Sequence, residues 1–235
     1  MFVTQFNEVL TLGKESVIFF WVLLAAHIRF ASGKVLHKHT AAGVSNLYRG
    51  TQSLNLCALF GHGITLNDAQ FTGTPIPTLE EVLTLAAKYN KLLLNVEIKD
   101  MTCEAVDKTV NALHRFGLEG RSVIACFDAE IIRYTKKTYP HMRCQGFPGR
   151  YMKNFTEDTY DCMFGMGIPI GWKDCTEESI QKDVVFAKSR GILAWLFCAD
   201  TEEDVRSCVQ YDCDNITGND PEVALRVLRE MRLHC

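Results

Sequence analysis

The feature that most constrains this chain is a regular alternation of helical and strand patterns along most of its length. Runs with apolar residues at helical spacing alternate with short runs rich in β-branched and aromatic residues. This alternation is typical of a parallel α/β sheet or barrel, because each helix carries the chain back to the start of the next strand. At 235 residues the chain fits one such domain, so we predict a single domain over residues 1–235.

The boundaries of the elements follow from local signals. Thr78 and Glu81 form a capping-box pattern, which predicts a helix that ends near Tyr89. The predicted helices span residues 78–89, 103–116, 129–138, 176–189, 202–209 and 221–231. The predicted strands span residues 17–24, 92–99, 123–126, 142–146, 192–198 and 215–217. Residues 41–75 lack periodicity and are rich in Gly, Thr, Asn and Ser, which predicts an irregular loop region over one face of the domain.

Composition limits the class of protein and its partners. A hydrophobic content of 47% and a charged content of 23% predict a globular domain with a sizeable core. The formal net charge is only -3 and the basic residues are scattered, so we expect no nucleic-acid partner. The ten cysteines contain no C-x-x-C pair, and we interpret them as reduced thiols, mostly small core residues, rather than as disulfides. Reduced thiols fit a cytoplasmic protein.

One apolar stretch, residues 17–26, raises the question of a membrane segment. Its sequence is VIFFWVLLAA, and His27 and Arg29 follow directly. Because a helix needs roughly 20 apolar residues to span a bilayer, this stretch is too short. We prefer a buried strand over a membrane segment here and expect no stable transmembrane anchor.

Three segments resemble the glycerophosphodiester phosphodiesterase family. Residues 71–100, FTGTPIPTLEEVLTLAAKYNKLLLNVEIKD, closely resemble a family stretch in which a Pro-Thr-Leu-Glu-Glu helix start leads to a strand ending in Glu-x-Lys. Residues 123–140 are similar to the family's strand ending in Phe-Asp, and residues 191–230 to its Trp-bearing strand and closing segment. The resemblance covers about residues 68–232 and implies a TIM-type (β/α)8 barrel.

The resemblance also implies an activity and a set of site residues. Members of the family hydrolyse glycerophosphodiesters to glycerol 3-phosphate and an alcohol with the help of a divalent cation. Carried over by position, Glu97 is a ligand for Mg²⁺ or Ca²⁺, Lys99 is a phosphate partner, Trp195 is a wall against the glycerol group, and His39 is the remaining acid/base. Cleavage builds charge on phosphate oxygens and on the leaving alkoxide, so a cation and proton donors must lie within hydrogen-bond reach.

Each of these residues also has a structural interpretation. Glu97 and Lys99 are equally consistent with a salt bridge at the mouth of the barrel. His39, like its neighbour His37, also fits a solvated position on a loop. Trp195 lies within an apolar strand, where packing in the core is the usual role of an aromatic side chain.

The sequence departs from the family pattern before residue 68. The family's opening His-Arg-Gly strand is not matched, so we expect a barrel that lacks its first strand and whose open edges favour a homo-oligomer. The family's Glu-x-Asp metal ligands fall on Ile18 and Phe20, which cannot bind a cation. With one carboxylate and one histidine, we expect weak or no phosphodiesterase activity. The alternative is a non-catalytic barrel that binds a phosphorylated ligand or a protein partner.

Overall fold

Seven parallel strands form one sheet in the order in which they follow one another along the chain. The structure is a computed structural model that describes residues 19–22, 79–90, 92–218 and 221–233. The strands are β1 Phe19–Val22, β2 Leu93–Glu97, β3 Ser122–Ala125, β4 Arg143–Gly146, β5 Gly165–Pro169, β6 Leu193–Phe197 and β7 Asn215–Thr217. Every neighbouring pair is parallel and consecutive in the chain, and parallel neighbours require a crossover connection between them.

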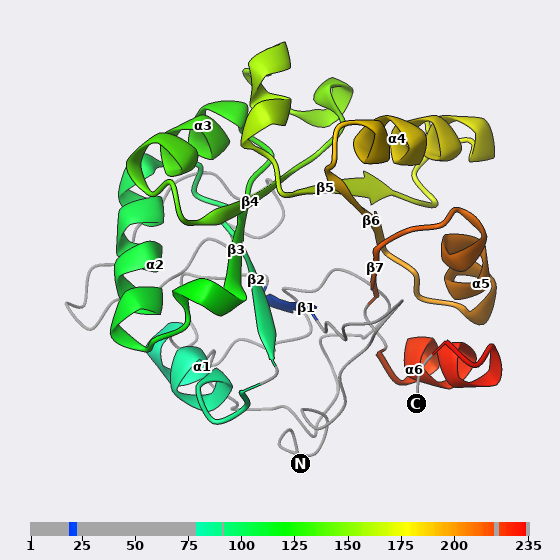
Figure 1. Cartoon of the computed structure of the whole chain (residues 1–235), viewed down its shortest axis with the longest axis horizontal. Helices are drawn as coiled ribbons and strands as arrows, with labels where there is room; N and C mark the ends of the chain where they lie inside the picture. The colour runs from blue at the N-terminus through cyan, green and yellow to red at the C-terminus, as the bar shows by residue number, and fades with distance from the viewer. Residues whose placement is uncertain (1–18, 23–78, 91, 219–220, 234–235) are drawn as a thin grey trace, which may run out of the picture.

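Six α-helices are described and lie around the outside of the curled sheet, and the first five of them lie between strands in the chain (Figure 1). They are α1 Leu79–Ala86, α2 Cys103–Arg115, α3 Ala129–Thr138, α4 Glu177–Ser189, α5 Glu202–Gln210 and α6 Pro221–Glu230. Three short 3-10 helices, η4 Glu119–Arg121, η5 Gly149–Tyr151 and η6 Glu157–Cys162, lie in the connections between strands. The α/β class predicted from the sequence is therefore confirmed.

Side-chain caps fix where several helices begin. Thr102 precedes α2 and accepts a hydrogen bond from the backbone N–H of Ala105, and Asp128 caps α3 in the same way. Thr176 and Thr201 form reciprocal capping boxes at the starts of α4 and α5. Each cap satisfies a backbone donor that the helix itself leaves unpaired.

The two faces of the sheet have different contents. Side chains such as Leu94 and Val96 on β2 face the helices and join a continuous apolar core. The alternate residues face the concave side, and the strand register aligns Glu97, Ala125, Gln145 and Gly165 on this inner face. The inner face is therefore where polar side chains of different strands meet.

Strand β5 was not predicted. Its sequence, Gly-Met-Gly-Ile-Pro, has one β-branched residue and no aromatic residue, and Gly and Pro are depleted in strands. Its inward positions are glycines for a steric reason, since a Cβ added at Gly165 would lie 2.8 Å from the Trp195 ring. A Cβ at Gly167 would meet Gln145 and the Phe147 ring. Glycine at these two positions thus leaves the space in front of the strand to bulky neighbouring side chains.

Some expectations concern residues outside the described ranges. These are the irregular loop region 41–75, His39 and the expected loss of a first strand. The predicted strand 17–24 is present in part, because β1 pairs with β2 in a parallel register that aligns Phe20 with Leu94. Within the described ranges, no helix combines the length and the apolar character needed to cross a membrane.

Candidate active site

Glu97 and Lys99 lie at the carboxyl end of β2 and form an ion pair. Lys99 Nζ donates to Glu97 Oε1, and Glu97 is the last residue of the strand. The Glu97 side chain is only 2% exposed, whereas that of Lys99 is 31% exposed. The pair therefore joins a buried carboxylate to an ammonium group that solvent can reach.

The surroundings of Glu97 disfavour its charge. Burial raises the pKa of the Glu97 carboxyl above its ordinary value, and the charge and hydrogen bond of Lys99 oppose this shift. The second oxygen, Oε2, is buried and has no hydrogen-bond partner among the described residues. A buried carboxylate oxygen without a partner is costly in a purely structural salt bridge, so this atom is available to a ligand or a water molecule.

Further polar side chains lie on the inner face of the sheet, on the same strand as Glu97 and on β4. Asn95 Nδ2 donates a hydrogen bond to Gln145 Oε1 across the strands. Trp195 is 2% exposed and packs with its ring against Gly165 and edge-on to Phe164, with 6.1 Å between the two ring centroids. The structure therefore places Trp195 in the packed interior of the sheet, and its predicted contact with a glycerol group is a matter for proposal.

A cluster of aromatic side chains stands beside Lys99 at the same end of the sheet. We call this cluster the aromatic rim, and its members are Phe127, Phe147, Tyr151, Trp172 and Phe197. Lys99 Nζ lies over the Phe127 ring at 5.7 Å from its centroid. Phe147 stacks on Phe127 with 3.5 Å between centroids. The rim therefore continues directly from the Glu97–Lys99 pair.

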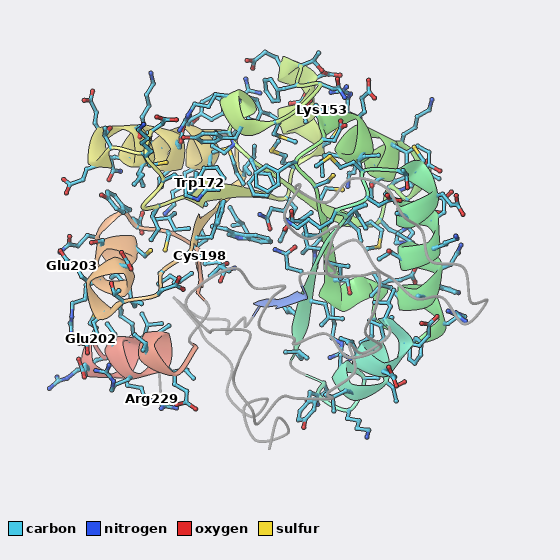
Figure 2. All side chains as sticks on the ribbon, turned by 180° about the vertical axis from the view of Figure 1, so that it is seen from behind. Lys153, Trp172, Cys198, Glu202, Glu203 and Arg229 are labelled. Atoms are coloured by element: carbon cyan, nitrogen blue, oxygen red, sulfur yellow. The ribbon has the colours of Figure 1, made fainter. Side chains whose placement is uncertain are left out.

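Trp172 is the exposed end of the aromatic rim. It follows β5 and is 43% exposed, and Cys198 lies on the neighbouring segment that follows β6 (Figure 2). The Trp172 ring stands edge-on to Phe197 at 5.6 Å and edge-on to Tyr151 at 5.4 Å. Two connections of the fold and the end of β6 thus meet around one exposed ring.

The loop that carries Tyr151 is anchored to α4 by a two-fold ion pair. Arg150 Nη1 donates to Asp183 Oδ1 at 2.8 Å, and Nη2 donates to Asp183 Oδ2. The adjacent Tyr151 hydroxyl shares a hydrogen bond of 3.3 Å with Cys175 Sγ. Because planar guanidinium–carboxylate pairs are geometrically specific, this contact fixes where Tyr151 stands relative to Trp172.

The described residues do not by themselves build a complete site for a hard divalent cation. Glu97 Oε2 suits one ligand position, since Mg²⁺ and Ca²⁺ prefer carboxylate oxygens. Within the described ranges, however, no group of three or more His, Cys, Asp or Glu side chains is arranged to hold a metal ion. Such ions take six or more oxygen ligands, so Glu97 alone cannot retain one.

Comparison with known proteins identifies the family of a chain with this fold and this strand-end pair. The family model described as "Glycerophosphoryl diester phosphodiesterase family" matches residues 31–223. The chain belongs to the glycerophosphoryl diester phosphodiesterase family. A curated glycerophosphodiester phosphodiesterase of Caldanaerobacter subterraneus subsp. tengcongensis is 24% identical over 166 residues, which cover 68% of this chain and 65% of that protein.

Solved structures of this family share the fold. A glycerophosphodiester phosphodiesterase from Parabacteroides distasonis aligns with a TM-score of 0.56 and 18% identity, covering 67% of this chain and 66% of that chain. A phosphodiesterase from Oleispira antarctica, solved with its product sn-glycerol-3-phosphate, aligns with a TM-score of 0.53 and 16% identity over 66% of this chain and 62% of that one. At these identities the likeness concerns the fold alone.

Sequence reasoning placed Glu97 and Lys99 together but missed the aromatic rim. A usable signal existed for Phe127 and Phe147, because each follows the end of a predicted strand, where parallel barrels collect their site residues. Trp172 had no such signal, since the strand that precedes it, β5, was not predicted. His39 lies outside the described ranges, so its role as an acid/base stays a prediction.

Proposed function

We propose that this protein hydrolyses glycerophosphodiesters to glycerol 3-phosphate and an alcohol, at the carboxyl end of β2. Membership of the family supports this reaction class. The observation that carries the proposal is the ion pair itself, in which the buried Glu97 holds the partly exposed Lys99 at the strand end and keeps one carboxylate oxygen without a described partner. A structural salt bridge gains nothing from an unsatisfied buried oxygen, whereas a ligand site does.

In this proposal Lys99 is the phosphate partner. A lysine ammonium has three donors, so Lys99 can keep its bond to Glu97 while it donates to a phosphate oxygen. The positive charge then stabilises the negative charge that develops on the equatorial oxygens during cleavage. Glu97 fixes the position of the ammonium group, and its Oε2 is the atom we assign to a divalent cation. Among the described residues, Glu97 would be the only carboxylate ligand of that cation in a group able to hold it, so it would hold the cation weakly.

The remaining roles complete the proposal. His39 is proposed as the general acid/base, which protonates the leaving alkoxide or activates the attacking water. Trp195 is proposed as a wall next to the glycerol group. We also propose that residues 1–235 form one domain built as a (β/α)8-type barrel, in keeping with the parallel β1–β7 order.

Hydrolysis of glycerophosphocholine tests the proposal. Release of glycerol 3-phosphate is measured with added Mg²⁺ or Ca²⁺ for the native chain and for the Glu97→Ala and Lys99→Ala variants. We expect each variant to lose on the order of 100-fold in kcat/KM, the usual cost of removing one charge-stabilising group. The matched control is Glu104→Ala, which breaks the exposed Glu104–Lys108 pair on α2 and is expected to leave turnover unchanged. Turnover that survives Glu97→Ala and Lys99→Ala would reject this site.

The incomplete ligand set favours a second candidate, a non-catalytic barrel that binds a phosphorylated ligand or a protein partner. Phe20 on β1 lies where the family pattern carries a metal ligand, and this replacement also favours the non-catalytic candidate. Calorimetry with glycerol 3-phosphate separates the two candidates. Binding that is lost in Lys99→Ala, in a chain without turnover, selects the binding function.

A further inference from the structure

Helix α5 ends in a compact turn that brings two cysteines together. Asp212 has a left-handed backbone, with a φ of 58°, and its N–H donates to the carbonyl of Val209 at 3.0 Å. The N–H of Cys213 donates to the carbonyl of Cys208 at 3.5 Å. These two backbone bonds define a Schellman motif, in which the side chains on either side of the turn contact each other. Cys208 and Cys213 occupy the two contact positions.

The two thiols lie against each other and are almost completely shielded from solvent. They share a hydrogen bond, and Cys208 is 0% exposed while Cys213 is 6% exposed. Both are free thiols in the structure. Disulfides join Cα atoms that lie about 4.4–6.8 Å apart, a separation that two residues joined by a backbone hydrogen bond reach. A bond between the two sulfurs therefore needs only a small movement and adds no atom to a packed region.

Contacts on both sides hold the turn in this shape. Lys188 on α4 donates to the carboxylate of Asp212 at 2.6 Å. The N–H of Asp214 donates to the carbonyl of Ala194 on β6, and the Asp214 carboxylate accepts from the N–H of Ala194, each at 2.8 Å. Because α4 and β6 fix the turn, the two thiols remain neighbours, and a reaction between them has the advantage of an intramolecular step.

This geometry favours oxidation of the pair over metal binding. A structural zinc site takes four ligands, and no group of three or more His, Cys, Asp or Glu side chains able to hold a metal exists in the described ranges. We propose that Cys208 and Cys213 form an oxidation site, at which a hydroperoxide joins the two sulfurs in a disulfide between α5 and the segment that leads into β7. This inference does not depend on the proposed function.

The surroundings of the two sulfurs set the order in which they react. The hydrogen bond to Cys213, together with burial, raises the pKa of the Cys208 thiol above its ordinary value. Cys208 therefore keeps its proton, and Cys213 is the sulfur that solvent reaches. Because thiolate character and access control oxidation by peroxide, Cys213 reacts first and Cys208 resolves the product.

The reaction has two steps, and hydrogen peroxide is its oxidant. In the first step the Cys213 sulfur forms a bond to one peroxide oxygen, the O–O bond breaks, and the second oxygen leaves with the thiol proton as water. In the second step the Cys208 sulfur attacks the resulting sulfenic acid, the S–S bond forms and the S–O bond breaks. The hydroxyl group leaves with the Cys208 proton as a second water, so two electrons pass from the thiols to the peroxide.

Peptide mass spectrometry of the full native chain tests the site without any substitution. The chain is treated with hydrogen peroxide, unfolded in excess N-ethylmaleimide to label the remaining thiols, and digested with trypsin without a reductant. Cleavage after Arg206 and Arg226 releases residues 207–226 as one peptide. Its only cysteines are Cys208 and Cys213. We expect this peptide to be unlabelled and lighter by two hydrogens than its dithiol form, and dithiothreitol added before labelling should restore two labelled cysteines.

Cys126 is the matched control within the same chain. It is also 0% exposed, but its thiol donates to the backbone carbonyl of Ile98 at 3.3 Å, so we expect it to stay reduced and labelled. In Cys208→Ala the second step is impossible, and dimedone should therefore label Cys213 as its sulfenic acid. The inference is overturned if both cysteines of the native peptide remain labelled after oxidation, or if Cys126 loses its label to the same extent. A sulfinic acid at Cys213 in place of the disulfide would overturn it as well.

Urea denaturation of the oxidised and the reduced chain provides a second measurement. A disulfide restricts the unfolded chain, so the oxidised chain should unfold at a higher urea concentration than the reduced chain. A lower midpoint after oxidation would mean that the turn must distort to form the bond, which contradicts a pair held in place by the Schellman motif.

Discussion

Replacing Glu97 by glutamine is the sharpest test of the electrostatics at the strand end. The substitution keeps the side-chain volume and an oxygen that can accept the bond from Lys99, but it removes the buried charge. Burial outweighs the attraction of Lys99, so the pKa of the Glu97 carboxyl is raised above its ordinary value. The ionised form is therefore less favourable in the folded chain than in the unfolded chain, and the neutral glutamine should be preferred at neutral pH.

The magnitude and its pH dependence follow from the direction of this shift. Replacing both members of a buried ion pair by apolar residues is often neutral or stabilising by about 1–4 kcal/mol, whereas removing one member is costly when the other stays buried. The Lys99 side chain is 31% exposed, so solvent can stabilise its ammonium group after the substitution. We expect Glu97→Gln to raise the free energy of unfolding by about 1–2 kcal/mol at pH 8. A raised carboxyl pKa contributes stability below its unfolded value, and this is lost as the pH rises through the folded value. The advantage of glutamine should therefore vanish near pH 4 and grow with pH.

Urea denaturation at pH 4, 6 and 8 measures this difference for the native chain and the variant. The matched control is Glu104→Gln, which neutralises the exposed carboxylate paired with Lys108 and should change stability by less than about 0.5 kcal/mol at every pH. The reasoning is refuted if Glu97→Gln is less stable than the native chain at pH 8 without added metal. If added Mg²⁺ or Ca²⁺ reverses the order, Glu97 is instead acting as a cation ligand.

Further predictions concern the interior and the thiols. Trp195→Ala should lower the free energy of unfolding by about 3–5 kcal/mol, because the buried ring leaves a cavity, and urea denaturation measures this loss. Gly165→Ala should cost about 1–3 kcal/mol in the same assay, since its Cβ meets the Trp195 ring, and a neutral result would contradict the packing described here. Burial raises the pKa of the Cys126 and Cys144 thiols to about 12, so iodoacetamide at pH 8 should modify them much more slowly than the exposed Cys103. Peptide mass spectrometry after brief treatment of the native chain checks this order, and equal rates would be inconsistent with it.

Much of the fold could be predicted because local signals and tertiary packing agree. Helix α3 begins and ends at the predicted residues, since Asp128 supplies a strong cap and Ile131 and Ile132 mark its buried face. Strand β5 could not be predicted, because its inward glycines reflect the sizes of Trp195 on β6 and of Phe147, which directly follows β4. Its sequence depends on contacts across the sheet, and no local pattern reports them.

The candidate site likewise contains contacts that could be predicted from the sequence and contacts that could not. The Glu-x-Lys spacing places Glu97 and Lys99 at a strand end, and a strand end in a parallel sheet is sufficient to bring them together. The position of Tyr151 beside Trp172 depends on the contact between Arg150 and Asp183, which lie 33 residues apart. A contact at that separation has no signature in the sequence of one chain.

The complementary side-chain sizes on β5 and β6 have a consequence for engineering this protein. Neighbouring strands share a fixed space, in which one contributes only hydrogen atoms where the other contributes an indole ring. A larger residue on the first strand is tolerated only together with a smaller one on the second, so the two positions must be varied as a pair. Libraries that randomise one strand at a time will therefore recover mainly the native residues at both positions.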